Sequence, residues 1–426
     1  MRRVFLYSFL LTTGLFISWW LEGRSKEVAT MLAMFCLSFI MIRIGFGFEI
    51  TRAQPQKYLW DYMVSTTTTV LPWAFCAMYF VFAMAPAELW RSRDMWWEAA
   101  VLGRFAAPTS VGLLFPMLAA AGLSATWLYR KARILAIFDD LESTLLFVPL
   151  KFFVVSRNIK LVVLVFVIFG LLWAAWKYVP FLRLPSTWPW LLLYSAIIVA
   201  VTEIIKLASR VVDDTVPVQV EVLVLGFILG CMLARAPSRG RVVRDTQRGP
   251  ARGLESPREE KAALIVSAFF MLLVGLSLPH FAATQSKGGL EETRIANKFV
   301  DVSPEVLAQK EHFPGWGIIA VHVLIITALS NIGKMGPALC DRKEASRRER
   351  LALAIGMFPR GEVGASMLVL CVSYGIAGPA LTVAVLSLAL NLLCSGLCVL
   401  LIRRLMAPHQ GGLTQASLAA VPSRPR

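Results

Sequence analysis

The chain has 426 residues, of which 57% are hydrophobic and 16% are charged, and its mean hydropathy is +0.65. These values exclude a soluble globular protein, because a domain of this size could not keep so much apolar surface away from water. The net charge of +16 would suggest nucleic-acid binding in a soluble protein. Here the basic residues stand mainly between apolar runs, so we expect no nucleic-acid partner.

Apolar runs long enough to cross a lipid bilayer recur along the chain, and they predict an all-α polytopic membrane protein. A spanning helix needs about 20 mainly apolar residues, and about 12 such runs can be delimited. The predicted spans are 4–22, 28–49, 58–84, 96–121, 133–154, 160–180, 187–208, 217–235, 262–283, 316–340, 351–373 and 377–402.

The first run follows Arg2 and Arg3 and resembles a signal peptide, but the sequence ISWWLEG at its end offers no small-residue cleavage site. We therefore expect this run to be retained as a membrane anchor. With a cytoplasmic N-terminus, the segments on the cytoplasmic side hold most of the Lys and Arg residues, as the positive-inside rule requires. Both termini are thus predicted to lie in the cytoplasm.

The fourth and eleventh predicted spans are each interrupted by proline and glycine. The fourth contains GRFAAPTSVG, where Pro108 cannot donate to the helical ladder and Thr109 and Ser110 add hydroxyl groups beside it. The eleventh contains GMFPRGEVGAS, where Pro359 and Gly361 enclose a charged residue. A lone proline would indicate only a kink. Two breaks in two halves of the chain predict inverted repeats with two discontinuous helices, 4 and 11.

The fifth predicted span contains the acids of FDDLES, which include Asp139 and Asp140. A charge at the centre of a spanning helix costs about 2.5 to 3.5 kcal/mol, so these acids need a compensating role. Neighbours on a helix point about 100° apart, and the two carboxylates therefore serve different surroundings. The alternative to a transport site is a buried polar network that only fixes helix packing.

The tenth predicted span carries Lys334 in SNIGKMGPALC, with Gly333 and Gly336 allowing a neighbouring helix to approach closely. A buried ammonium needs an anionic partner. Snorkelling of the side chain toward the cytoplasmic interface is the alternative.

Residues 236–261 are rich in Arg, Gly and Pro and predict a flexible cytoplasmic linker. The linker divides an N-terminal membrane half, 1–235 with helices 1 to 8, from a C-terminal half, 262–404 with helices 9 to 12. Its charge fits the positive-inside rule, and contact with anionic lipid is the alternative. Residues 405–426 are predicted to be a disordered cytoplasmic tail.

The residues that enzymes and metal sites require do not accompany the buried acids. The seven cysteines are scattered through apolar runs without paired metal-ligand spacing. The four histidines also stand apart from the acids, and no nucleophile motif is present. We expect a transporter that uses no cofactor, and not an enzyme.

The sequence resembles the cation/proton antiporter superfamily, in particular the bacterial sodium/proton antiporters with a paired aspartate on the fifth helix. The likeness covers most of the chain and is carried, in order, by FGFEI, APTSVGLLFPMLAAAGL, FDDLES, EVLVLGFILGCMLAR, FFMLLVGLSLP, GKMG and GMFPRGEVGASM. Three features depart from the family pattern: Arg43 and Arg104 stand where neutral residues are expected, and the external segment 284–315 is long.

The resemblance implies roles for residues at the matching positions. Asp139 and Asp140 would bind the ion, with Asp140 as the principal ligand, and a transient sodium site would include Thr109 and Ser110. The implied charge-coupling residues are Lys334, as the basic partner of the acids, together with Arg360 and Glu362 of the Arg-Gly-Glu motif. The implied helix breaks are at Pro108, Pro359 and Gly361, where the resemblance implies that the discontinuous helices 4 and 11 cross.

The implied function is secondary active antiport of Na⁺, or another monovalent cation, against H⁺ by competition for the aspartate pair. The paired Asp-Asp resembles the electrogenic branch, and the resemblance places the protein in a bacterial inner membrane, as a homodimer in the lipid bilayer. A K⁺ efflux or channel-like permease of the same fold and a non-transporting membrane sensor are the alternatives.

Overall fold

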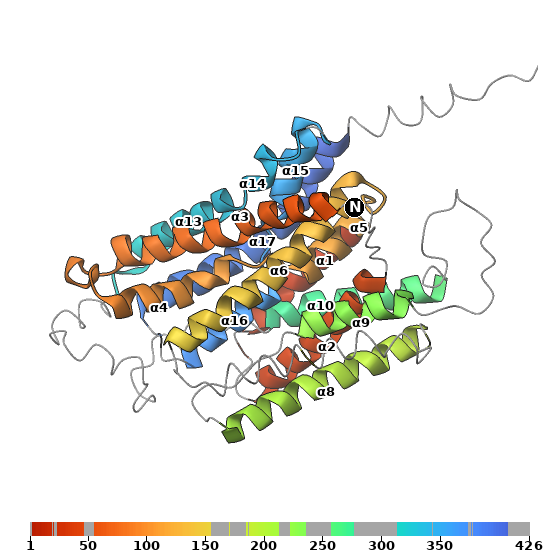
Figure 1. The fold of residues 1–426 in the computed structure, drawn as a ribbon, viewed down its shortest axis with the longest axis horizontal. Coiled ribbons are helices and arrows are strands. Elements are labelled where there is room, and N and C mark those ends of the chain that lie inside the picture. Colours follow the sequence, from red (N-terminus) through yellow and green to blue (C-terminus); the bar gives the residue numbers. More distant parts are fainter. Residues whose placement is uncertain are drawn as a thin grey trace, which may run out of the picture. The chain divides into compact units, whose positions relative to one another are not determined.

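The computed structural model describes residues 2–18, 20, 24–46, 55–154, 170, 185, 187–212, 222–235, 257–276, 313–342, 344–373, 376 and 378–407. Every regular element in these ranges is helical (Figure 1). The α-helices are α1 (Arg2–Ser18), α2 (Arg24–Phe46), α3 (Pro55–Tyr79), α4 (Arg93–Gly103), α5 (Val111–Ala120), α6 (Trp127–Val154), α8 (Trp188–Val212), α9 (Val222–Arg235), α10 (Pro257–Leu276), α13 (Trp316–Gly333), α14 (Gly336–Leu339), α15 (Arg347–Gly356), α16 (Glu362–Ser373) and α17 (Pro379–Met406).

The helices have the length and composition of membrane spans. Six stretches of the described chain are long and apolar enough to cross a bilayer, and three shorter apolar helices accompany them. Large apolar side chains such as Phe9, Ile204 and Leu397 are each 66% exposed, as expected where lipid is the solvent. The protein is thus an all-α polytopic membrane protein, as the sequence predicts.

The predicted spans coincide with one or two of these helices, apart from 160–180, which lies outside the described residues except at Gly170. Helix α10 begins at Pro257 and so includes the last residues of the predicted linker. Proline is favoured in the first helical turn, and Glu259 and Glu260 follow it near the positive end of the helix dipole. The rest of the linker, most of the segment 284–315 and the tail from residue 408 lie outside the described residues.

The chain forms two compact units, and each draws on segments far apart in the sequence. Unit 1 comprises Met1–Ser8, Leu59–Asp139 and Phe281–Arg426, and unit 2 comprises Phe9–Tyr58 and Asp140–His280. Each unit thus contains segments from both predicted membrane halves. The division into halves at the linker remains a prediction about the chain's repeats.

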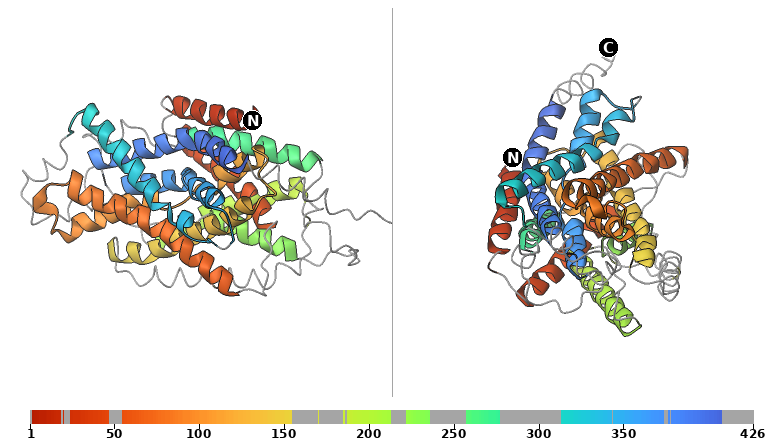
Figure 2. Two further views of the ribbon diagram at one scale, coloured as in Figure 1. Left: turned by 90° about the horizontal axis from the view of Figure 1, so that it is seen from above. Right: turned by 90° about the vertical axis from the view of Figure 1, so that its left-hand side faces the viewer.

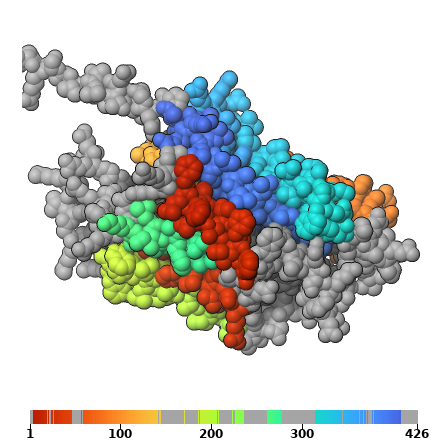
Figure 3. Space-filling view, turned by 180° about the vertical axis from the view of Figure 1, so that it is seen from behind, coloured from red at the N-terminus to blue at the C-terminus, as the bar shows by residue number. Residues whose placement is uncertain are grey.

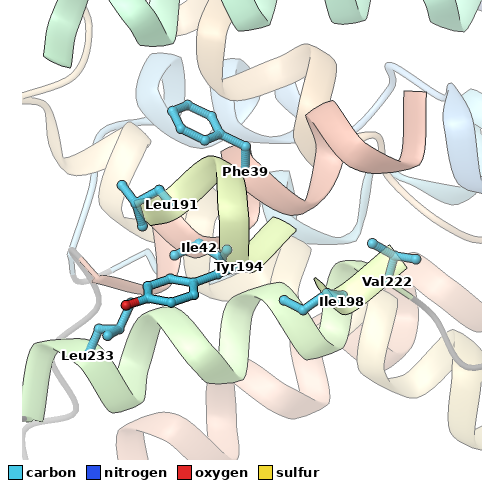
Figure 4. Close-up of a cluster of buried hydrophobic side chains, with 7 residues drawn as sticks. All are labelled: Phe39, Ile42, Leu191, Tyr194, Ile198, Val222 and Leu233. Carbon is cyan, nitrogen blue, oxygen red and sulfur yellow. The ribbon is translucent and has the colours of Figure 1, made fainter. Parts of the chain in front are cut away.

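Unit 2 is held together by apolar and small residues on α2, α8, α9 and α10. Buried side chains from α2, α8 and α9 form one cluster, namely Phe39, Ile42, Leu191, Tyr194, Ile198, Val222 and Leu233 (Figure 4). Gly226 and Gly230 of α9 lie against the α2 backbone, where added Cβ atoms would meet the carbonyl oxygens of Ser38 and Ile42. This is the close small-residue packing common between membrane helices.

Unit 1 contains α3, α4, α5, the first half of α6 and the helices from α13 to α17. Helices α3 and α13 lie side by side (Figures 1 and 2), and a Cβ atom at Gly333 would lie 2.5 Å from the Pro72 nitrogen. Helix α17 packs against α13 and α15, and Figure 3 shows α17 in blue beside α13 in cyan. The hydrogen bonds and ion pairs of the candidate site described below all join residues of unit 1.

Candidate ion-binding site

The fourth predicted span is broken as the sequence indicates. Helix α4 ends at Gly103 and continues as the 3-10 turn η3 (Arg104–Ala106), and α5 starts at Val111. Pro108 interrupts the ladder between them. Ser110 caps α5, because its side-chain oxygen accepts a hydrogen bond from the Leu113 amide at 3.3 Å. The break leaves the backbone around Thr109 available for other partners.

The eleventh predicted span is broken in the same way. Helix α15 begins with a capping box formed by Ser346 and Glu349 and ends at Gly356, and α16 begins at Glu362. The irregular segment between them, 357–361, contains Pro359. The two predicted discontinuous helices are therefore confirmed.

The two breaks meet. The Ser110 amide donates a hydrogen bond to the Pro359 carbonyl at 2.8 Å, so each irregular segment satisfies part of the other's backbone. Gly361 permits this approach, since an added Cβ atom would lie 2.6 Å from Leu113 Cδ1 and 2.8 Å from Ser110 Oγ. Backbone without helical hydrogen bonds is tolerated at membrane depth only where protein or a polar cavity supplies partners.

Asp139 projects from α6 into this crossing and is fully buried. Its Oδ2 accepts hydrogen bonds from the Thr109 amide at 2.9 Å and from the Thr109 hydroxyl at 2.7 Å. Its Oδ1 accepts a short hydrogen bond from Thr69 Oγ1 and a longer one from Thr68 Oγ1 at 3.4 Å. The carboxylate is thus surrounded by neutral donors from α3 and from the first break.

Lys334 lies in a third interruption, between α13 and α14, and its side chain is fully buried. Its ammonium contacts three oxygens: Asp139 Oδ2 at 2.7 Å, Thr109 Oγ1 at 3.0 Å and the Ala107 carbonyl. A cation in this position is held by one carboxylate, one hydroxyl and one freed backbone carbonyl. Lys334 therefore points into the site, and the snorkelling alternative is excluded. The helix interruption at 334–335 was not predicted.

Arg360, in the second break, is also fully buried and binds backbone carbonyls at helix ends. Its guanidinium donates to the Ala106 carbonyl at 2.9 Å and to the Ser330 carbonyl at 2.7 Å, and also to Asn331 Oδ1 at 2.8 Å. These carbonyls lie near the C-terminal ends of η3 and α13, where the helix dipole is negative. Arg360 thereby ties the second break to the other two interruptions.

For two other site residues predicted from the sequence, Asp140 and Glu362, the structure describes the position in the chain. Asp140 is buried, with 4% of its surface exposed, and follows Asp139 on α6, but the hydrogen bonds described above go to Asp139. Glu362 is the first residue of α16, and its side chain lies outside the described part of the chain. The roles predicted for both residues remain predictions.

The two arginines that depart from the family pattern both lie at C-terminal helix ends. Arg43 is in the last turn of α2. Arg104 lies in η3, directly after α4, and is buried, with its Nη1 atom 2.5 Å from the Met367 sulfur. Positive charge is favourable at such ends.

Sequence reasoning missed the contribution of α3. Thr68 and Thr69 bind Asp139, and Asn331 binds Arg360, but none of them was singled out. A signal was present, because the sequence STTTT at 65–69 places consecutive hydroxyl groups inside an otherwise apolar span. Hydroxyl groups are common in membrane helices, where they bond their own backbone, so the run alone did not point to a site.

Comparison with known proteins supports the architecture. No family model and no curated protein matches the chain. Among solved structures, the chain is similar to the sodium proton antiporter MjNhaP1 from Methanocaldococcus jannaschii, with a TM-score of 0.51 and 14% identity over 92% of this chain and 91% of that chain. The chain has the fold of this antiporter. At this low identity the likeness shows the fold alone.

The polar atoms that meet Lys334 at the crossing are oxygens of a carboxylate, a hydroxyl group and a backbone carbonyl. Among the described residues, no group of three or more His, Cys, Asp or Glu side chains could hold a metal ion. Carboxylate, hydroxyl and carbonyl oxygens suit hard cations. In the described conformation, the Lys334 ammonium occupies the position between these oxygens.

Proposed function

We propose that the protein is a secondary transporter that exchanges Na⁺, or another monovalent cation, for H⁺ across the membrane. One observation carries the proposal: a fully buried ammonium, Lys334, is held by Asp139, Thr109 and the Ala107 carbonyl at the crossing of two broken helices. A site that holds one buried positive charge through oxygen atoms can hold another in its place. The antiporter fold agrees with this function, and an enzyme is not supported.

The exchange follows from competition for the carboxylates. When Lys334 leaves Asp139, the carboxylate must be neutralised by a metal cation or by a proton, because an uncompensated buried charge is costly. Asp139, Asp140 and the oxygens of Thr109 and Ser110 would surround the cation, with Asp140 as its principal ligand. Since both ions neutralise the same groups, binding of one releases the other, and the two fluxes are coupled.

The helix interruptions supply what such a site needs. Backbone groups released at 107–110 and 357–361 provide polar contacts at membrane depth without further buried charges. Arg360 and Glu362, beside the second break, are proposed to set the local charge together with Lys334. If the exchange moves net charge, the membrane potential contributes about 2.3 kcal/mol per charge per 100 mV.

The proposed setting is a bacterial inner membrane, with both termini in the cytoplasm and two copies forming a homodimer. Alternating access would move the helices that carry the breaks relative to the remaining helices, so that the site faces one side of the membrane at a time.

Purified protein in proteoliposomes with an internal pH dye tests the proposal. Successive additions of Na⁺, Li⁺ and K⁺ should each report whether that cation drives proton movement. Asp139→Asn should abolish the signal while the protein keeps its elution volume and its thermal unfolding transition, and Asp140→Asn should also abolish it. Glu88→Gln, which neutralises an exposed acid outside the site, is the matched control.

Retention of cation-driven proton movement in Asp139→Asn would contradict the assignment. Cation flux that persists after the proton gradient is collapsed would instead indicate a channel-like permease. Wild-type protein that moves no cation under any condition would indicate a sensor.

A further inference from the structure

A second buried lysine–aspartate pair lies within unit 1, at the ends of α3 and α6. Lys131 Nζ lies 2.5 Å from Asp61 Oδ1, and these side chains are 3% and 0% exposed. The same ammonium lies 2.9 Å from Asp341 Oδ2 and 3.7 Å from Glu344 Oε2, both in the loop between α14 and α15. One ammonium thus serves two buried carboxylates and a third, Glu344, that is 33% exposed.

Only one of the two oxygens of the Asp61 carboxylate has a hydrogen-bond partner among the described residues. Its Oδ1 contacts Lys131, whereas its Oδ2 is buried and has no hydrogen-bond partner among the described residues. A structural tether between two helices needs one acid and one base, both fully bonded. The surplus of carboxylates and the unbonded buried oxygen together make Asp61 a place where an additional positive charge is stabilised.

Besides Asp61 itself, the ion pairs of this cluster among the described residues involve α6 and the α14–α15 loop. Lys131 approaches from α6, and Asp341 and Glu344 approach from the α14–α15 loop. The nearby arginines bind backbone instead: Arg350 donates to the Ala338 and Cys340 carbonyls, and Arg342 donates to the Leu339 carbonyl. Asp341 is further fixed by the Trp60 indole, which donates to its Oδ1 at 3.1 Å.

Buried polar side chains follow one face of α3 from Asp61 to the candidate ion-binding site. Along α3, Asp61, Ser65, Thr68 and Thr69 are all fully buried and recur at helical spacing, while Leu59, Met63 and Met78 on the same helix are exposed. The helix therefore turns its polar side inward. Buried ionisable groups in membrane helices characteristically face such polar interiors and mark ion or proton pathways.

Helix α6 lies alongside this face of α3 and contacts it at regular intervals. Asp61 contacts Lys131, Ser65 Oγ donates to the Leu135 carbonyl at 3.0 Å, and Thr69 Oγ1 donates to Asp139, so each contact joins residues 70 positions apart. The two helices run parallel with one polar contact per turn. Two turns of α3 separate Asp61 from Thr69, about 12 Å at 1.5 Å per residue.

We infer that Asp61 is a second proton-binding carboxylate, which passes protons between the Glu344 side of the cluster and Asp139 along the hydroxyl groups of α3. Hydroxyl groups both donate and accept hydrogen bonds, so they can relay a proton without carrying a charge. Ser65 lies one turn from Asp61, a gap that one water molecule can bridge. The role rests on the proposed exchange at Asp139, since Asp61 is the group that supplies it with protons.

The relay role is tested with Asp61→Asn in proteoliposomes by two flux measurements. Exchange of radioactive Na⁺ for unlabelled Na⁺ requires no proton transfer, whereas Na⁺/H⁺ exchange does. The variant should keep Na⁺/Na⁺ exchange within about twofold and slow Na⁺/H⁺ exchange by about a hundredfold, the lower end of the range for a positioned proton-transfer group. Glu349→Gln, which keeps the capping box of α15, is the matched control and should change neither flux.

Equal slowing of both fluxes, or no slowing of either, would overturn the relay role and leave the proposed function intact. Wild-type protein that shows neither flux with Na⁺, Li⁺ or K⁺ would overturn the proposed function. Asp341→Asn provides a second variant, because asparagine tolerates the positive φ of 52° at this position. Loss of one neighbouring negative charge should weaken proton binding at Asp61 and move the pH profile of exchange to lower pH. An unchanged profile would also count against the role.

Infrared spectroscopy tests proton binding by Asp61 without transport. The wild-type protein should show a protonated-carboxyl C=O band that changes with pH and is missing from Asp61→Asn. Identical pH-difference spectra for the two proteins would refute the inference even if exchange is observed.

Discussion

Two buried lysine–aspartate pairs lie on the same face of α6, and they are balanced differently. Lys334 forms a salt bridge with Asp139, and it also donates to two neutral oxygens, Thr109 Oγ1 and the Ala107 carbonyl. Lys131 faces Asp61 and Asp341, with Glu344 at the rim. Asp139 accepts hydrogen bonds from three threonines besides its lysine, whereas Asp61 has one unbonded oxygen.

The difference shows how one protein can place an exchangeable cation at one carboxylate and bind a proton at another carboxylate a short distance away. At Asp139, neutral donors stabilise the carboxylate whichever cation is present, so the cation can be exchanged. At Asp61, the ion pairs among the described residues set one ammonium, Lys131, against three carboxylates, so the cluster favours an additional proton.

The largest effect is expected from loss of Lys131. Lys131→Ala leaves two buried carboxylates without their ammonium and should lower the free energy of unfolding by about 3–5 kcal/mol. Lys334→Ala should cost less, about 1–3 kcal/mol, because Asp139 keeps its threonine donors. Thermal or denaturant unfolding of the detergent-solubilised variants measures the difference.

A matched double variant controls for this result. Adding Asp61→Asn to Lys131→Ala should restore part of the lost stability, since it removes the carboxylate left unpaired. A Lys334→Ala variant that is less stable than Lys131→Ala would show that the contrast between the two pairs is misjudged.

A smaller effect is expected at the crossing of the broken helices. Gly361→Ala places a Cβ atom against Leu113 and Ser110 and should destabilise the protein by about 1–3 kcal/mol while reducing exchange. Gly317→Ala is the control, since nothing lies within 4 Å of a Cβ atom there. Equal unfolding temperatures and exchange rates for the two variants would mean that the close approach at Gly361 is unimportant.

The smallest effect is expected from Thr69→Val, which keeps the shape of the side chain and removes one hydrogen bond to Asp139. Stability should fall by about 1 kcal/mol, and the Na⁺ concentration for half-maximal exchange should change. Thr66→Val, whose hydroxyl bonds only the Tyr62 carbonyl among the described partners, should leave that concentration unchanged. The same half-maximal concentration in both variants would remove Thr69 from the site.

The sequence predicted those parts of the site that local chemistry controls. Pro108 and Pro359 break helices whatever their surroundings, and both breaks lie where they were expected. The burial of Asp139 and Lys334 in apolar spans also indicated a site, because such charges are otherwise too costly.

The remaining parts depend on pairings between distant segments, which no local pattern encodes. Asp61 and Lys131 stand near the ends of the predicted spans 58–84 and 133–154, where charged residues are common at the membrane interface. Their contact forms because α3 and α6 run parallel, with Asp61 facing the residue of α6 that lies 70 positions later in the sequence. The choice of Asp139 as the residue bonded to Thr109 and Lys334 depends on helix rotation, which the sequence of two adjacent aspartates leaves open.

The central claim, that a metal cation and a proton compete at Asp139, is tested most directly by proton release on binding. Na⁺ is added to purified protein in weakly buffered detergent solution while a dye reports the pH. The account predicts that the wild-type protein releases protons in a saturable manner and that Asp139→Asn releases none. Saturable Na⁺ binding without proton release in the wild type, or equal release in the variant, would contradict it.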